Sequence, residues 1–143
     1  MMFKTILLPI DLAEKVSWQR SLPAALNLCG SDGVLHVIAV LPDFGMAMVG
    51  TYFQEGFEEQ ALHDLGEHLT GWVNENIPGD VEVHPHVMHG RVYDQIIAAA
   101  DKLNVDAIVM SSHRPELTDY LLGPNASRVV RHAKQSVFVV RGD

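Results

Sequence analysis

Cysteine is almost absent from this sequence. Its 143 residues include one cysteine, Cys29, so no disulfide can form within the chain. Disulfide frameworks belong mainly to secreted domains, whereas a single cysteine among apolar helical positions is typical of a reduced thiol in a protein core. We therefore expect a cytoplasmic protein with a buried, reduced Cys29.

Positive charge is also scarce. Lysine and arginine number 10 against 18 acidic residues, which gives a formal net charge of −8. Nucleic acids and anionic membranes bind proteins chiefly through lysine and arginine. The charge balance therefore predicts neither a nucleic-acid nor a membrane partner, although one small anion held locally remains compatible with it.

Long apolar runs are missing as well. The opening residues MMFKTILLPIDL contain an apolar run that is too short for a signal peptide or a membrane span, and Asp11 interrupts it. Two common phosphate motifs are lacking too. No G-x-x-x-x-G-K-[ST] follows an apolar run, and residues 9–13 contain no glycine. These gaps argue against a P-loop NTPase and a common dinucleotide-binding domain.

What the sequence does contain is a regular alternation of strand and helix patterns. Apolar, β-branched runs predict strands over residues 5–10, 34–41, 81–88, 107–110 and 136–141. Helical spacing predicts helices over residues 14–30, 57–76 and 92–103, and a last helix opening at residues 121–125. Pro23 should kink or restart the first helix, and Pro85 should interrupt the third strand and favour a sheet edge.

This alternation predicts an α/β fold with a parallel sheet covered by helices on both faces, that is, a three-layer sandwich. We expect residues 1–143 to form one domain, because the chain is of ordinary domain length. Residues 42–55 lack periodicity, and we interpret them as a connector packed on the domain or, alternatively, as a lid or contact surface.

The stretch at residues 106–133, DAIVMSSHRPELTDYLLGPNASRVVRHA, is the centre of the predicted site. It predicts a strand, then a polar loop, then a helix with Pro124 near its first position. Backbone N–H groups and the positive end of the helix dipole would meet there, which favours an anion. Ligands of such sheets bind beyond the carboxyl ends of the strands, where strand order reverses. If the first and fourth strands are neighbours there, Asp11 faces residues 111–114.

The sequence resembles the universal stress protein family. The resemblance is carried by KTILLPID, LHVIAV, HGRVYDQI…VDAIVM and DAIVMSSHR…LLGPNASRVVRHA…SVFVVR, and it covers most of the chain outside residues 42–82. The family resemblance implies a Rossmann-like sandwich with strand order 3-2-1-4-5 and a dimer. It also implies a stress-response protein that binds ATP.

Nucleotide-binding members of that family carry Gly-x-x-Gly, nine residues and then Gly-Ser or Gly-Thr. Here Ser111 and Arg114 stand at the first two glycines, Gly123 at the third and Pro124 at the following hydroxyl residue. Only eight residues separate Arg114 from Gly123. Arg114 offers a permanent cation in place of glycine freedom, and Asn125 offers a donor in place of the missing hydroxyl.

The resemblance thus implies a cytoplasmic sensor or adaptor that binds ATP, with Mg²⁺ as a possible companion, and at most weak ATPase activity. The alternatives are a dimeric interaction module without nucleotide and a slow ATP hydrolase. A homodimer would form through residues 136–141, and the protein partner is unknown. The predicted nucleotide site comprises Pro9, Ile10, Asp11, Val37, Met110, Ser111, His113, Arg114, Gly123, Pro124, Asn125 and Ala126.

Three histidines form a separate candidate. His84 and His86 lie two residues apart on a predicted strand and therefore share a face, and His89 follows at the end of that strand. Three imidazoles suit a transition metal, but no nearby carboxylate or cysteine completes a recognisable ligand set. We interpret the pattern as a solvated strand face rather than a metal site.

Overall fold

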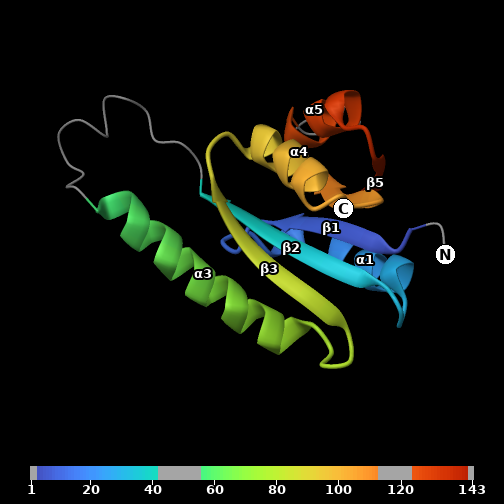
Figure 1. Ribbon diagram of the computed structural model, residues 1–143, viewed down its shortest axis with the longest axis horizontal. Helices are drawn as coiled ribbons and strands as arrows, with labels where there is room; N and C mark the ends of the chain where they lie inside the picture. Colours follow the sequence, from blue (N-terminus) through green and yellow to red (C-terminus); the bar gives the residue numbers. More distant parts are fainter. Residues whose placement is uncertain (1–2, 42–55, 113–123, 142–143) are drawn as a thin grey trace.

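A computed structural model describes residues 3–41, 56–112 and 124–141 of the chain. Within them, five parallel strands form one sheet in the order β3-β2-β1-β4-β5, as predicted (Figure 1). The strands are β1 (Thr5–Ile10), β2 (Val34–Leu41), β3 (Glu82–His89), β4 (Ala107–Ser112) and β5 (Ser136–Arg141). The order reverses at β1, because β2 lies on one side of it and β4 on the other.

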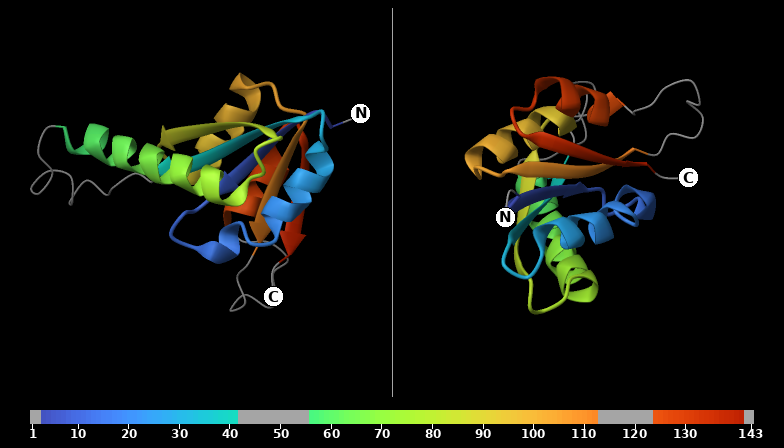
Figure 2. Two further views of the ribbon diagram at one scale, coloured as in Figure 1. Left: turned by 90° about the horizontal axis from the view of Figure 1, so that it is seen from below. Right: turned by 90° about the vertical axis from the view of Figure 1, so that its right-hand side faces the viewer.

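Helices cover both faces of this sheet (Figure 2, right). They are the short 3-10 helix η1 (Lys15–Ser17) and the α-helices α1 (Ser21–Cys29), α3 (Phe57–Asn76), α4 (Val92–Lys102) and α5 (Pro124–His132). One core cluster lies between the sheet and α1 with α3, and the other between the sheet and α4 with α5. The predicted three-layer α/β sandwich is confirmed.

The central strand β1 explains why an unbroken apolar run was present in the sequence. Ile6 and Leu8 belong to one core cluster and Leu7 to the other, and all three side chains are fully buried. A parallel strand covered by helices on both faces must be apolar at every position rather than at alternate ones. The predicted bounds of β2 and β5 are confirmed as well.

The predicted first helix over residues 14–30 is wrong in its N-terminal part. The chain after β1 turns through η1, and α1 begins only at Ser21. Pro23 therefore lies in the first turn of α1. The predicted restart of the helix near Pro23 agrees with this start, and proline is tolerated there because the N–H groups of a first turn have no intrahelical partner.

Pro85 was predicted to interrupt the third strand, and this is also wrong. β3 runs without a break from Glu82 to His89 and pairs with β2 along its whole length, with Pro85 opposite Val37. The predicted edge position is confirmed, since β3 is the last strand on its side of the sheet. An edge strand tolerates proline because one side of its backbone has no ladder to complete.

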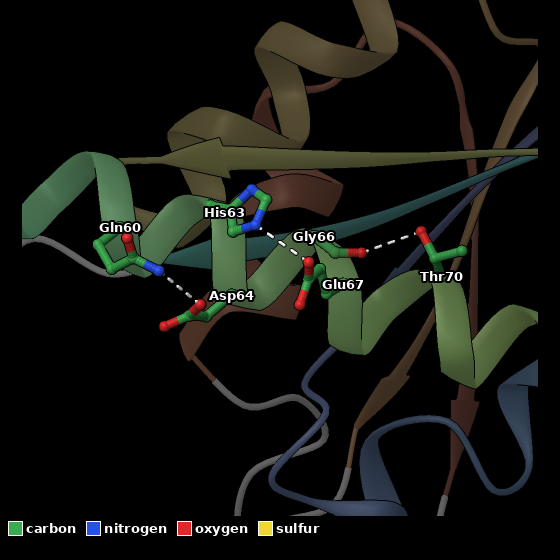
Figure 3. Close-up of polar contacts among 6 residues, drawn as sticks. All are labelled: Gln60, His63, Asp64, Gly66, Glu67 and Thr70. Atoms are coloured by element: carbon green, nitrogen blue, oxygen red, sulfur yellow. Dashed lines mark hydrogen bonds and ion pairs between the residues drawn. The ribbon is translucent and has the colours of Figure 1, made fainter.

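The long helix α3 has the predicted bounds and buries only part of its surface. Its C-terminal half packs Leu69, Trp72 and Val73 into the core. On the exposed face, pairs four residues apart stabilise the helix: Gln60 donates to Asp64 at 2.9 Å, and His63 lies 3.0 Å from Glu67 (Figure 3). The helix end at Phe57 projects beyond the sheet in Figure 1.

Candidate functional site

The candidate site begins where two neighbouring strands separate. β1 pairs with β2 through Ile10, but its pairing with β4 ends at Leu7 opposite Ile108. Beyond that pair the carboxyl ends of β1 and β4 diverge, at the point where strand order reverses. Pro9 follows the last pair and has no N–H with which to continue a ladder. This is the position at which open parallel sheets bind their ligands.

A cavity of about 260 Å³ occupies this divergence. Apolar side chains line much of it, including Ile10 from β1, Val40 from β2 and Ile96 from α4. Its polar groups come from Asp11 after β1, Ser17 in η1, Ser111 on β4 and Asn125 on α5; Pro9, Val92 and Met110 complete the lining. An apolar pocket with a few converging polar groups is the usual form of a small-molecule site.

Asp11 is fixed in place by its own loop. Its side-chain Oδ1 accepts a hydrogen bond from the Ala13 N–H at 3.0 Å, and its backbone oxygen accepts one from Glu14. The Ser17 hydroxyl accepts from the Asp11 N–H and donates back to the Asp11 backbone oxygen, both at 2.9 Å. These bonds hold the Asp11 residue at the cavity wall. The turn that begins at Asp11 is also the reason why α1 starts late.

Ser111 presents an unsatisfied hydroxyl to the same cavity. Its Oγ is buried and has no hydrogen-bond partner in the described part of the chain. A buried hydroxyl without a partner costs free energy, so such an atom is worth explaining wherever it occurs. A ligand in the cavity would supply the missing partner.

Asn125 brings the start of α5 to the cavity. The described part of this helix begins at Pro124, and its first turn contains no acidic residue. Pro124 has no N–H to offer, but Asn125 adds a side-chain amide at the positive end of the helix dipole. This end of the site is therefore suited to negative charge.

The structure brings together half of the residues predicted for the site. Those that line the cavity are Pro9, Ile10, Asp11, Met110, Ser111 and Asn125. Pro124 lines an adjoining cavity. Val37 and Ala126 are not among the lining residues, and both side chains are buried in the core. His113, Arg114 and Gly123 lie outside the described residues.

Four lining residues were absent from the predicted site: Ser17, Val40, Val92 and Ile96. Val40 had a usable signal, since it alternates with the core residue Ala39 and so faces the other side of the sheet. Val92 and Ile96 are four residues apart and therefore share a face of α4. Ser17 had no signal, because its position depends on the turn after Asp11.

Three histidines on β2 and β3 form a separate cluster. His36 on β2 joins His84 and His86 on β3, with His36 Nδ1 2.9 Å from His86 Nε2 and the His36 and His84 rings stacked at 5.3 Å. Burial, followed by the neighbouring imidazoles, lowers the pKa of His36 and of His86. His89 contacts Glu58 instead. No group suited to a metal occurs in residues 3–41, 56–112 and 124–141.

Cys29 is free and fully buried, as expected. Burial is the main cause that raises the pKa of its thiol, and the nearby Glu82 charge adds to it. Its close neighbour Gly33 has no room for a side chain, because a Cβ there would lie 2.8 Å from the Cys29 Sγ.

No helix in the described ranges has the length and apolar character needed to cross a membrane.

Several known proteins share the overall fold. The universal stress protein UspA from Lactobacillus plantarum superposes with a TM-score of 0.71 at 18% identity, over 99% of both chains. A universal stress protein in complex with cAMP gives 0.62 at 17% identity, over 100% of both chains. The Archaeoglobus fulgidus universal stress protein in complex with dAMP gives 0.61 at 19%, over 97% of this chain and 98% of that one.

Comparison of sequences shows the family as well as the fold. Universal stress protein G of Escherichia coli O157:H7 is 34% identical over 142 residues, which cover 98% of this chain and 100% of that protein. The family model described as "Universal stress protein family" matches residues 2–141 and so includes residues 42–82, which the resemblance described above did not cover. The chain therefore belongs to the universal stress protein family.

Proposed function

We propose that this protein is a cytoplasmic universal stress protein that binds ATP in the cavity between β1 and β4 and acts as a sensor or adaptor in the stress response. The observation that carries the proposal is the set of polar side chains that converge in this otherwise apolar cavity. Asp11 stands on one wall, and Ser111 with Asn125 stands on the other, at the reversal of strand order. The family relatives in complex with cAMP and dAMP support an adenine nucleotide as the ligand class.

The lining of the cavity offers a suitable region for each of three parts of a nucleotide: the base, the ribose and the first phosphate. The apolar wall of Ile10, Val40 and Met110 suits the flat face of an adenine ring. The Asp11 carboxylate suits a ribose hydroxyl, because Asp11 lines the cavity and carboxylate oxygens accept hydrogen bonds. Asn125 at the start of α5 suits the first phosphate.

Magnesium is part of this proposal for the triphosphate. Asp11 carries a negative charge at the mouth of the same cavity, and a triphosphate beside it would be repelled. Mg²⁺ binds substrate phosphates and usually keeps several waters, and its charge would offset the repulsion between Asp11 and the triphosphate. The role of Arg114, His113 and Gly123 at the phosphates remains part of the prediction from the family pattern.

We propose binding rather than catalysis as the main activity. General acid–base hydrolysis requires a base positioned near the reacting phosphate, usually with metal-binding carboxylates. Asp11 is the one carboxylate among the described lining residues, and its loop holds it by a hydrogen bond to Oδ1. A weak ATPase would show as steady-state phosphate release that disappears in Asp11→Ala. Binding without phosphate release supports the sensor or adaptor.

We also propose a homodimer that forms through β5, with residues 1–143 as one domain. β5 is the last strand on its side of the described sheet and pairs only with β4 there. Phe138 on this strand is 39% exposed, although Phe3 packs edge-on against it at 5.3 Å. An apolar edge strand favours pairing with another chain, and a two-fold axis would satisfy both edges at once.

A thermal-shift experiment tests the nucleotide proposal. ATP with Mg²⁺ should raise the Tm of the protein and AMP should raise it less, because a ligand stabilises the state that binds it. GTP serves as the control for the base. No shift with any adenine nucleotide at about 100 times a micromolar Kd would leave the dimeric interaction module as the function.

A further inference from the structure

A second cavity adjoins the first and has a different chemistry. It measures about 420 Å³, and its lining includes Arg91, Tyr93 and Arg128. The two cavities share Val92 and Asn125 as lining residues, so they meet at the starts of α4 and α5. A ligand that fills the first cavity and extends past Asn125 would enter the second.

Two arginines in this second cavity gather about one tyrosine. The Arg91 and Arg128 Nη1 atoms donate to the Tyr93 hydroxyl at 3.1 and 3.3 Å. The Arg128 guanidinium also lies over the Tyr93 ring, 4.8 Å from its centroid, and that of Arg91 lies 5.8 Å from it. The neutral Tyr93 side chain thus contacts both guanidinium cations, through its hydroxyl and through its ring.

Among the described residues, one carboxylate lies near these two cations. Arg91 lies 3.9 Å from Asp94, but both side chains are more than half exposed, and such a contact is weak in water. Arg128 forms no ion pair with a carboxylate of the described residues. In a chain of net charge −8, this is a local concentration of positive charge. An anion bound between the two guanidiniums would remove their mutual repulsion.

The backbone at this point favours an anion as well. α4 begins with Arg91 as its N-cap, and the Arg91 side chain makes no capping hydrogen bond to the first turn. Pro124 opens the described part of α5 beside it. The positive ends of two helix dipoles therefore converge on the cavity that holds the arginines. In the adjoining first cavity, the buried Ser111 hydroxyl has no partner among the described residues, which is an independent indication of a ligand there.

We infer that Arg91, Tyr93 and Arg128 form a polyphosphate subsite, which receives the terminal phosphates of a nucleotide whose base lies in the cavity between β1 and β4. The inference rests on the proposed function for the base and ribose, and it goes beyond it by assigning specificity. Guanidiniums form paired hydrogen bonds with phosphate oxygens, so each added phosphate gains contacts at this subsite. The protein should therefore prefer nucleoside triphosphates to monophosphates.

The test compares ATP with AMP in the full-length protein and in single variants. Arg128→Gln removes the guanidinium while keeping a polar side chain, and Arg131→Gln on the same helix is the matched control, since Arg131 is exposed and lies outside both cavities. Calorimetry at about 0.15 M ionic strength avoids long-range charge effects. Arg128→Gln should weaken ATP binding about tenfold and leave AMP binding within about twofold, whereas Arg131→Gln should change neither.

Tyr93→Phe provides a second variant that keeps the aromatic ring. It removes the hydroxyl that holds both guanidiniums, so ATP affinity should fall several-fold while AMP affinity stays unchanged. Equal losses for ATP and AMP in Arg128→Gln, or an equal effect of Arg131→Gln, would overturn the subsite. If the folded wild-type protein binds neither nucleotide, the proposed function fails, and inorganic triphosphate then decides the subsite alone. Its thermal shift should vanish in Arg128→Gln, and a shift that persists would overturn the inference.

Discussion

Leu7 and Ile108 are the last pair of residues that join β1 to β4. Past this pair the two strands separate, and Pro9 and Ile10 on one side face Met110 and Ser111 on the other across the cavity. The pairing of β1 with β2 continues through Ile10 opposite Ala39, so only one side of β1 opens. The position of the site thus follows from an early end to one ladder.

Asp11 should contribute directly to nucleoside binding. Asp11→Ala removes the carboxylate proposed to accept from the ribose, and the affinity for uncharged adenosine should fall about tenfold. Adenosine is the useful ligand because phosphate repulsion does not enter. Asp80→Ala, an exposed acid in the turn before β3, is the control and should change nothing. Unchanged adenosine binding in Asp11→Ala would contradict the assigned role.

Ser111 should matter for ligand binding and not for stability. Its buried hydroxyl has no partner among the described residues, so Ser111→Ala loses no hydrogen bond and should not lower the free energy of unfolding of the ligand-free protein. ATP affinity should nevertheless fall several-fold in titration calorimetry. Ser21→Ala is the matched control, because the buried Ser21 hydroxyl donates to Ser17 O at 3.1 Å. That variant should lose about 1 kcal/mol of stability in urea unfolding and keep its affinity. The reverse pattern would show that Ser111 has a structural role.

The histidine cluster should make stability depend on pH. The pKa values of His36 and His86 are lowered in the folded protein from their ordinary value of 6.5, first by burial and then by neighbouring charge. The groups that act on the pair are His84, Glu82 and Lys102. The unfolded chain then binds more protons, so the stability contribution is complete above about pH 6.5 and is lost as the pH falls toward the folded values.

His86→Gln should flatten this decline. The variant cannot be protonated, and its amide can still donate to or accept from His36 Nδ1. Unfolding in urea at about pH 7, 6 and 5 measures the slope. His132→Gln, an exposed histidine on α5, is the control and should keep the wild-type slope. An unchanged slope in His86→Gln would count against the cluster as the source of the pH dependence.

The edge strand β5 should carry the dimer. Val139→Pro removes an N–H in this strand and should convert a dimer to a monomer in sedimentation at tens of micromolar, a concentration at which a working dimer is assembled. Because Val139 lies opposite Met110 of β4, a melt monitored by circular dichroism must show that the fold persists. Phe138→Lys is a gentler second variant at an exposed side chain. Monomeric wild-type protein under these conditions would contradict the proposal.

The elements that could be predicted from the sequence are those in which burial determines the pattern of apolar residues. β2, α3 and β5 have the predicted bounds, because each shows a strong period of apolar residues or an unbroken apolar run. β4 runs two residues past its predicted end, since Ser111 and Ser112 continue to pair with β5 after the apolar residues stop. The interruption predicted at Pro85 is wrong because a strand at a sheet edge tolerates a proline that an inner strand does not.

The candidate site was harder to predict than the fold. Asp11, Ser111 and Asn125 were found because they follow strands or open a helix, which are positions that topology alone brings together. Val40 and Ile96 were missed because they read as ordinary core residues. The meeting of Arg91 with Arg128 on Tyr93 could not be anticipated, since it depends on how α4 packs against α5.

Titration calorimetry of the wild-type protein with Mg-ATP tests the central claim most directly. The account predicts saturable binding of one ATP per chain, with a Kd in the micromolar range or tighter, and weaker binding of AMP. The titration should be made on protein stripped of bound nucleotide, so that the sites are open at the start. Absence of any binding heat up to about 1 mM Mg-ATP, by a folded sample, would contradict the account.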